Sequence, residues 1–154
     1  MGEREIKMID ITEKSVVYRY AKASGKIKLK RSTIEAIVEN RIKKGDVISA
    51  TKIVAIQSVK KTPDLLPLCH PIPITGVNVE VKPNINECYV EVSVEVKSVG
   101  KTGVEMEALT GVMAGLLNIW DMTKYLEKDE KGQYPDTKIF DIKVEKKVKE
   151  GYYG

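Results

Sequence analysis

The chain has few of the residues that build metal centres and disulfide frameworks. Its 154 residues include one histidine, His70, and two cysteines, Cys69 and Cys88. A zinc site needs several such ligands at a recognisable spacing, and this sequence offers none, so we expect no bound metal. Cys88 alternates with Val90 and Val92, a pattern that predicts a cysteine packed within a core strand.

Aromatic residues and long apolar runs are also scarce. Aromatics make up 6% of the chain, which disfavours an RNA-binding sheet because such sheets stack bases on exposed aromatic rings. The net charge of +4 permits an anionic partner without implying one. No apolar run approaches a membrane span, and the first ten residues are charged where a signal peptide is apolar. We therefore expect a cytoplasmic protein with neither a membrane nor a nucleic-acid partner.

Hydrophobic periodicity predicts an α+β fold. Strands alternate apolar with polar residues, and helices carry an apolar stripe. Ser32 and Glu35 form a possible capping box at the start of the first helix; Gly45 is placed to end that helix and Asp46 to cap the next. The order favours an antiparallel or mixed sheet with helices on one face, ferredoxin-like in outline, in a single domain covering residues 1–154. The predicted elements are strand 26–30, helix 32–43, helix 46–59, strands 77–81 and 90–96, helix 104–126 and strand 138–144.

The single histidine lies in a stiff segment. Pro67, Pro71 and Pro73 restrict the backbone around Cys69 and His70. An imidazole that titrates near neutrality on such a segment suits proton transfer or ligand orientation, although a lone histidine can equally be structural. A nucleophilic Cys69–His70 pair is disfavoured because adjacent side chains on extended backbone point apart.

Two pairs of charged residues lie on the long helix predicted at 104–126. Glu105 and Glu107 could stabilise its N-terminus or contact a ligand. Asp121 and Lys124, at i and i+3, could form an ordinary surface ion pair or, in a cleft, a general acid and base. If the helix is unbroken, the 14 residues between Glu107 and Asp121 separate them by about 21 Å. Either the start of the segment is not helical, or one pocket takes groups from two subunits, which we favour.

Lysines supply further candidates. Lys44 precedes a helix N-terminus and could help to bind an oxyanion, or simply complement a helix dipole. The terminal lysines could protect an edge strand or complete a polyanion site. They are Lys143, Lys146, Lys147 and Lys149. The stretch GKTG at 100–103 lacks the spacing of a P-loop.

Three blocks together resemble the MoaC family, the cyclic pyranopterin monophosphate synthases of molybdenum cofactor biosynthesis. They are LPLCHP at 66–71, GKTGVEMEALT at 100–110 and WDMTK at 120–124. The resemblance implies conversion of a cyclised dihydroguanosine triphosphate to cyclic pyranopterin monophosphate and pyrophosphate. It also implies a hexamer built as a trimer of dimers, with the pocket at a dimer interface. The implied pocket contains Lys44, Leu68, Cys69, His70, Glu105, Met106, Glu107, Asp121, Lys124 and Lys147.

The match is weaker at both ends of the chain. Residues 145–150 replace a glycine- and serine-rich stretch of bacterial members, and Arg19 lies in a region without a sharp motif.

These residues support a mechanism. Lys44 and Lys147 would hold phosphate, and Glu105 or Glu107 would accept hydrogen bonds from the pyrimidine edge. Asp121 with Lys124 would be the acid/base pair and His70 the next candidate. Mg²⁺ could accompany the triphosphate, with no tightly bound cofactor. RNA binding and an inert assembly subunit are the alternatives.

Overall fold

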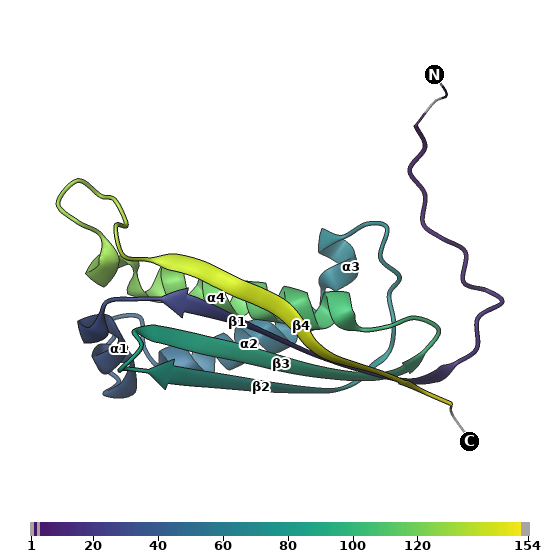
Figure 1. Cartoon of the computed structure of the whole chain (residues 1–154), viewed down its shortest axis with the longest axis horizontal. Coiled ribbons are helices and arrows are strands. Elements are labelled where there is room, and N and C mark those ends of the chain that lie inside the picture. Colours follow the sequence, from purple (N-terminus) through teal and green to yellow (C-terminus); the bar gives the residue numbers. More distant parts are fainter. Residues whose placement is uncertain (1, 3, 152–154) are drawn as a thin grey trace.

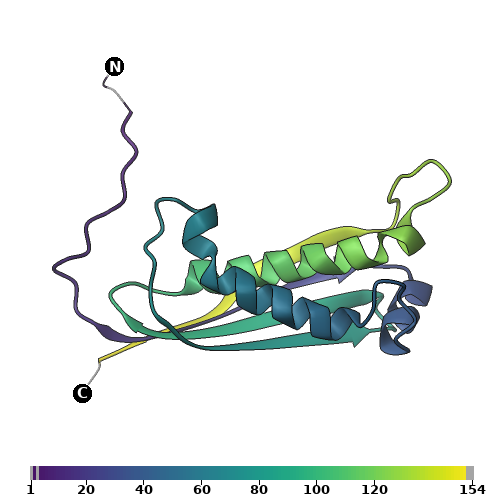
Figure 2. The same ribbon diagram turned by 180° about the vertical axis from the view of Figure 1, so that it is seen from behind.

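The computed structural model describes residue 2 and residues 4–151. A four-stranded antiparallel sheet, in the order β2-β3-β1-β4, carries the helices on one face (Figure 1), and the reverse view shows α2 and α4 side by side across it (Figure 2). The predicted α+β arrangement is confirmed. The elements are β1 (Val17–Lys28), α1 (Arg31–Val38), α2 (Val47–Lys60), α3 (Thr62–Leu65), β2 (Ile74–Asn84), β3 (Tyr89–Gly100), α4 (Glu105–Glu127) and β4 (Lys138–Glu150).

The core lies between the helices and the valine-rich face of the sheet. Val90, Val92, Val94 and Val96 of β3 are fully buried, as their alternation predicts. On β1, Gly25 lets α4 approach closely, because a Cβ there would lie 2.9 Å from side chains of α4 and β4. The long helix therefore packs closely against β1 at this point.

The first helix is shorter than predicted. It ends at Val38 because Asn40 adopts a φ of 55° and closes the helix, with Arg41 N–H donating to the Ala36 carbonyl at 2.8 Å. The prediction that Gly45 ends this helix was therefore wrong. Lys44 and Gly45 instead lie in the loop between α1 and α2, and Asp46 caps α2 by accepting from the Ser49 N–H, as predicted.

The prediction that Ser32 and Glu35 form a capping box at the start of α1 was also wrong. The helix begins at Arg31, so Ser32 lies inside it, and the carboxylate of Glu127 at the end of α4 accepts from the Lys30 N–H and the Thr33 hydroxyl. Glu127 is fully buried and also accepts from the Thr137 hydroxyl at 2.7 Å. One carboxylate thus joins the C-terminal end of α4 to the start of α1 and the approach to β4.

The strands are longer than their sequence patterns predicted. β1 begins at Val17 instead of residue 26, and β4 continues to Glu150 instead of residue 144, which places Lys147 opposite Ala21. Cys88 lies in the turn between β2 and β3 with a φ of 57°, only partly buried, and not within a strand. In the part of the chain that the structure describes, no helix is long and apolar enough to cross a membrane.

Candidate active site

The residues expected in the pocket collect at the two ends of α4. Lys44, Asp121 and Lys124 meet at the C-terminal end. The others surround the N-terminal end, where the loop before β2 and the far part of β4 approach α4. These are Leu68, Cys69, His70, Glu105, Met106, Glu107 and Lys147.

A groove of about 490 Å³ opens at the N-terminal end of α4. The proline-rich loop forms one wall, and the segment entering α4 forms the other. Its lining residues are Leu66, Pro67, Leu68, Cys69, His70, Thr102, Gly103, Glu105 and Met106. Arg19, itself buried, donates to the carbonyls of Gly100 and Lys101 and so supports the second wall from β1.

Glu105 presents a carboxylate to this groove. Its Oε2 lies 3.4 Å from Lys147 Nζ, whereas its Oε1 is buried and has no hydrogen-bond partner among the described residues. Gly103 makes room for this side chain, since a Cβ at position 103 would overlap Glu105 Oε1. A buried acceptor oxygen without a donor is costly in a protein alone, and a ligand N–H can satisfy it.

Glu107 is more deeply buried than Glu105 and does not line this groove; it lines a separate cavity of about 50 Å³ together with Pro71 and Ile72. Its residue exposure is 2%, and burial raises the pKa of its carboxyl group. The Cys69 thiol donates to Oε2 at 3.8 Å, and Oε1 has no partner within the described residues. Burial and the neighbouring Glu107 carboxyl raise the pKa of Cys69, which favours a thiol over a nucleophilic thiolate.

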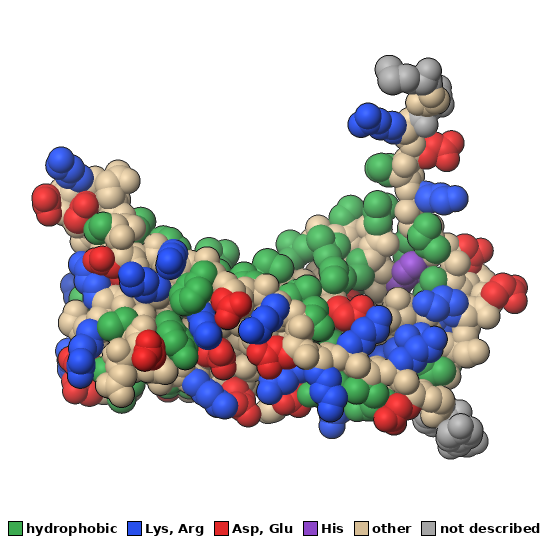
Figure 3. Space-filling model, in the orientation of Figure 1, with side chains coloured by type: hydrophobic (Ala, Val, Ile, Leu, Met, Phe, Trp, Pro, Cys, Tyr) green, Lys and Arg blue, Asp and Glu red, His purple; other side chains and the backbone are tan. Residues whose placement is uncertain are grey.

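The side chains of His70 and Cys69 have different partners, and no hydrogen bond joins the imidazole to the thiol among the described residues. Its Nε2 lies 2.5 Å from the Ile9 carbonyl oxygen, in the segment that precedes β1. Lys101 Nζ donates to the Thr12 carbonyl at 2.9 Å in the same segment. Figure 3 shows the histidine at the base of this projecting segment, beside Lys and Arg side chains. No sequence pattern predicts the contact between Ile9 and His70, because the two residues are 61 positions apart and share no motif.

At the other end of α4, Asp121 bridges two lysines. Its Oδ2 lies 2.8 Å from Lys44 Nζ and its Oδ1 lies 3.1 Å from Lys124 Nζ, so the predicted i,i+3 pair forms. Hydrogen bonds from Lys44 and then Lys124 lower the pKa of Asp121. Tyr125, which sequence reasoning missed, accepts from the Lys43 N–H at 2.9 Å and fastens the Lys44 loop to α4.

Within one chain, the residue clusters at the two ends of α4 are too far apart to bind the same small molecule. α4 is continuous from Glu105 to Glu127, so Glu107 and Asp121 are separated by about 21 Å along its axis. This removes the alternative in which the segment begins outside a helix. One copy therefore presents two separate clusters, here called half-sites only as names: the sheltered one around Glu105 and Glu107, and the open one around Asp121.

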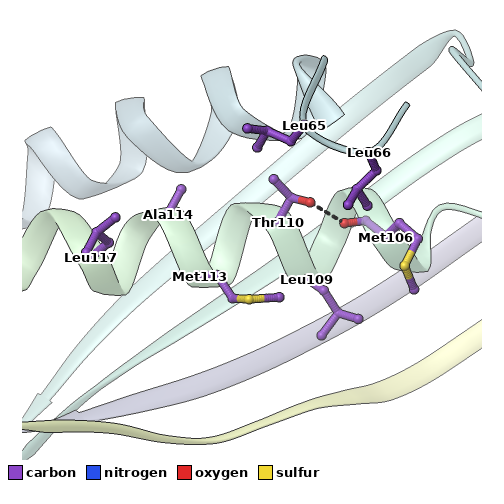
Figure 4. A pocket seen from close by; sticks show the side chains of 8 residues that line it. All are labelled: Leu65, Leu66, Met106, Leu109, Thr110, Met113, Ala114 and Leu117. Atoms are coloured by element: carbon purple, nitrogen blue, oxygen red, sulfur yellow. Dashed lines mark hydrogen bonds between the residues drawn. The ribbon is translucent and has the colours of Figure 1, made fainter. Parts of the chain in front are cut away.

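An apolar groove of about 340 Å³ lies between the half-sites (Figure 4). Leu117 is 64% exposed and Met113 is 48% exposed, unusual values for large apolar side chains on the same helix face. The small side chain of Ala114 lies between them in the close view. The groove is lined by Leu65, Leu66, Met106, Leu109, Thr110, Met113, Ala114 and Leu117.

Sequence comparison assigns this chain to one family of proteins. The model of the MoaC family matches residues 8–150, and the chain belongs to that family. A relative from Pyrococcus furiosus is 55% identical over 150 residues, covering 97% of this chain and 95% of the relative. A relative from Aeropyrum pernix is 57% identical over 142 residues, covering 92% and 96%. Both relatives are named probable cyclic pyranopterin monophosphate synthase.

Proposed function

We propose that this protein is a cyclic pyranopterin monophosphate synthase of molybdenum cofactor biosynthesis. It converts (8S)-3′,8-cyclo-7,8-dihydroguanosine 5′-triphosphate to cyclic pyranopterin monophosphate and releases pyrophosphate. Membership of the MoaC family and relatives of that name at more than half identity support this activity. The observation that carries it is the pair of half-sites. At one end of α4, buried carboxylate oxygens have no donor within the part of the chain that the structure describes, and at the other end two lysines surround an ionised aspartate.

The sheltered half-site suits the ring of this substrate. Glu105 Oε1 and Glu107 Oε1 are acceptors without donors among the described residues, and the pyrimidine edge of a guanine-derived ring carries N–H groups. Leu68 and Met106 would cover the ring, and Lys147 beside Glu105 would reach a phosphate. His70 would move a proton at the edge of the groove.

The open half-site suits phosphate and proton transfer. Lys44 and Lys124 offer ammonium groups on either side of Asp121. Asp121, held ionised, would accept a proton from the substrate during ring opening or reclosure, and the Lys124 ammonium group would donate a proton to it. Lys44 would then hold phosphate. Mg²⁺ would arrive with the triphosphate, because no group of three potential protein ligands occurs in the described residues.

We further propose that a complete site forms between two copies. The midpoint between positions 107 and 121 is Ala114, one of the residues that line the apolar groove. If a twofold axis passes near Ala114, antiparallel α4 helices bring Glu107 level with Asp121 of a second copy, at an interaxial distance of about 8–10 Å. That spacing fits one small ligand, and the pairing would cover Met113 and Leu117. Three such dimers would form a hexamer, acting in the cytoplasm.

The direct test is incubation of the purified protein with the cyclised triphosphate, followed by analysis of the products. We expect equal amounts of cyclic pyranopterin monophosphate and pyrophosphate. Unchanged substrate would contradict the proposed activity and favour an inert assembly subunit. Steeply salt-dependent RNA binding without turnover would favour the RNA-binding alternative.

Mixed oligomers test the shared site. His70→Ala and Asp121→Asn are each expected to be inactive, but in a mixed pair one of the two sites has both halves intact. Random co-assembly makes about half of the pairs mixed, so about a quarter of wild-type activity should return. Asp121→Asn co-expressed with Lys124→Ala is the control, because both changes affect the same half-site and no intact site can form. Recovery in neither mixture would contradict a shared site.

A further inference from the structure

The segment before β1 makes two contacts that link it to the sheltered half-site. Residues 4–16, here called the N-terminal arm, contain no helix or strand and project from the body of the protein (Figure 1). The Ile9 carbonyl meets His70 Nε2, and three residues later the Thr12 carbonyl accepts from Lys101 Nζ. His70 and Lys101 also line, together with Met8–Thr12, another cavity of about 380 Å³.

The arm is locally ordered between these contacts. Asp10 Oδ1 accepts from the Thr12 N–H at 2.8 Å and from the Thr12 hydroxyl, which forms a tight turn. Those bonds lower the pKa of Asp10, so a carboxylate stays beside the imidazole and Lys101. Lys14 N–H closes a further turn on the Ile11 carbonyl at 3.0 Å. The carbonyl of Ile9 is therefore presented by a defined backbone conformation.

The chemistry of the Ile9 contact determines which imidazole nitrogen carries hydrogen. A carbonyl oxygen can only accept, so Nε2 must be the donor. In a neutral imidazole, the other nitrogen then has the free lone pair. Among the described residues, Nδ1 of His70 has no hydrogen-bond partner, which leaves it available for substrate.

We propose that the N-terminal arm is a positioning element, in which the Ile9 carbonyl, held by Lys101 and the Asp10 turn, fixes His70 with hydrogen on Nε2 and leaves Nδ1 to exchange protons with the substrate. This inference rests on the proposed role of His70 in proton transfer. The arm acts through the imidazole: without it the two tautomers interconvert, and only a fraction of the molecules holds the competent one.

The single histidine makes this directly measurable. Full-length protein labelled with ¹⁵N-histidine gives one pair of ring-nitrogen signals, and at about pH 9, where imidazoles are neutral, their shifts report the tautomer. We expect a predominantly Nε2-protonated ring in the wild-type protein. A ring protonated on Nδ1, or an even mixture, would overturn the proposal.

Two variants release the arm without touching His70. Lys101→Met removes the bond to Thr12 and retains an apolar stem, and Asp10→Ala removes the turn. Both should move the nitrogen signals toward a mixture and lower kcat about tenfold, with a smaller change in KM. Lys97→Met is the matched control, because Lys97 is an exposed lysine of β3, and it should change neither the spectrum nor kcat.

The ¹⁵N spectrum of the imidazole and the turnover rate distinguish a failure of the positioning role from a failure of the proposed activity. If both variants lose activity with an unchanged imidazole spectrum, the arm does not act through His70, and the proposed activity is unaffected. If His70→Ala turns over the substrate at the wild-type rate, His70 is not needed for proton transfer. The proposed role of the N-terminal arm is then overturned, even if the spectrum shows that the arm sets the tautomer.

Discussion

The surroundings at the two ends of α4 shift the pKa of a carboxyl group in opposite directions. Glu107 is almost completely buried, and loss of solvent raises its pKa toward a neutral acid. The side chain of Asp121 is 52% exposed, and two lysines lower its pKa and keep it ionised. Two carboxyl groups on one helix are thus biased toward different protonation states by their surroundings, an arrangement that provides both an acid and a base at one pH.

The ends also differ in how they are assembled. Asp121 and Lys124 are neighbours on one helix, and Lys44 joins them from the loop that Tyr125 fastens. The sheltered end needs the loop at 66–73, strand β4 and the N-terminal arm to meet the start of α4. We therefore expect substitutions at the open end to change catalysis with little effect on folding, and substitutions at the sheltered end to change both.

Removal of the charge on Asp121 should have the largest effect. Asp121→Asn keeps the size of the side chain but cannot accept a proton, so turnover should fall about 10²- to 10⁴-fold. Thermal unfolding should change little, because the side chain is half exposed. Pyrophosphate release measures the loss, and Asp136→Asn in the exposed loop after α4 is the control. Near-normal release would refute the assignment.

A charge in the apolar groove should separate the half-sites. Leu117→Asp places a carboxylate where the second copy is proposed to pack, and we expect dissociation with about a 10²-fold loss of kcat/KM. Sedimentation velocity measured beside activity checks both effects. Ile53→Asp on α2 is matched in exposure, at 66% against 64%, and lies outside the groove. A fully active monomeric Leu117→Asp protein would contradict the shared site.

A methyl group at position 103 should weaken substrate binding. Gly103→Ala forces the Glu105 carboxylate out of its present position and away from Lys147, so KM should rise about tenfold with a smaller change in kcat. Steady-state kinetics with the cyclised triphosphate measures this. Gly76→Ala is the control, because a Cβ there meets only Lys97 atoms, the nearest at 3.9 Å. An unchanged KM would argue against contact between Glu105 and substrate.

The smallest expected effect is on stability. The folded protein binds the Glu107 proton more tightly than the unfolded chain, so wild-type stability falls as pH rises from about 4.3 through the raised pKa. Glu107→Gln cannot ionise, so it should gain stability relative to the wild type as the pH rises through that range, with little difference at pH 4. Denaturant titrations at several pH values measure this, with exposed Glu87→Gln as the control. If the difference in the free energy of unfolding between Glu107→Gln and the wild type does not depend on pH, ionisation of Glu107 does not affect stability.

Local patterns predicted the parts of the molecule that depend on local physics. The long helix, its Asp121–Lys124 pair and the Asp46 cap each follow from residues within four positions of one another. The motif blocks also indicated both half-sites by resemblance. The rise of about 1.5 Å per residue predicted a separation of about 21 Å between Glu107 and Asp121 if the helix is unbroken. The structure confirms that α4 is unbroken.

Contacts between distant segments could not be predicted in this way. Glu127 caps α1 from 97 positions away, so the local Ser32 signal was misleading. Asn40 ended the helix because asparagine tolerates a left-handed conformation, and it competed successfully with the glycine five positions later. The Ile9 contact with His70 uses a backbone carbonyl, which every residue has and no side-chain pattern can reveal.

The continuity of α4 has a consequence for how such a sequence can change over time. Each residue added to a helix advances it by about 1.5 Å and turns it by about 100°, so one insertion between Glu107 and Asp121 would swing every later side chain to another side. Residues between Glu107 and Asp121 can be substituted, but the number of residues between them cannot change without moving the two side chains relative to each other. The loop from residue 128 to 136 does not share this helical constraint, and gain or loss of residues should concentrate there.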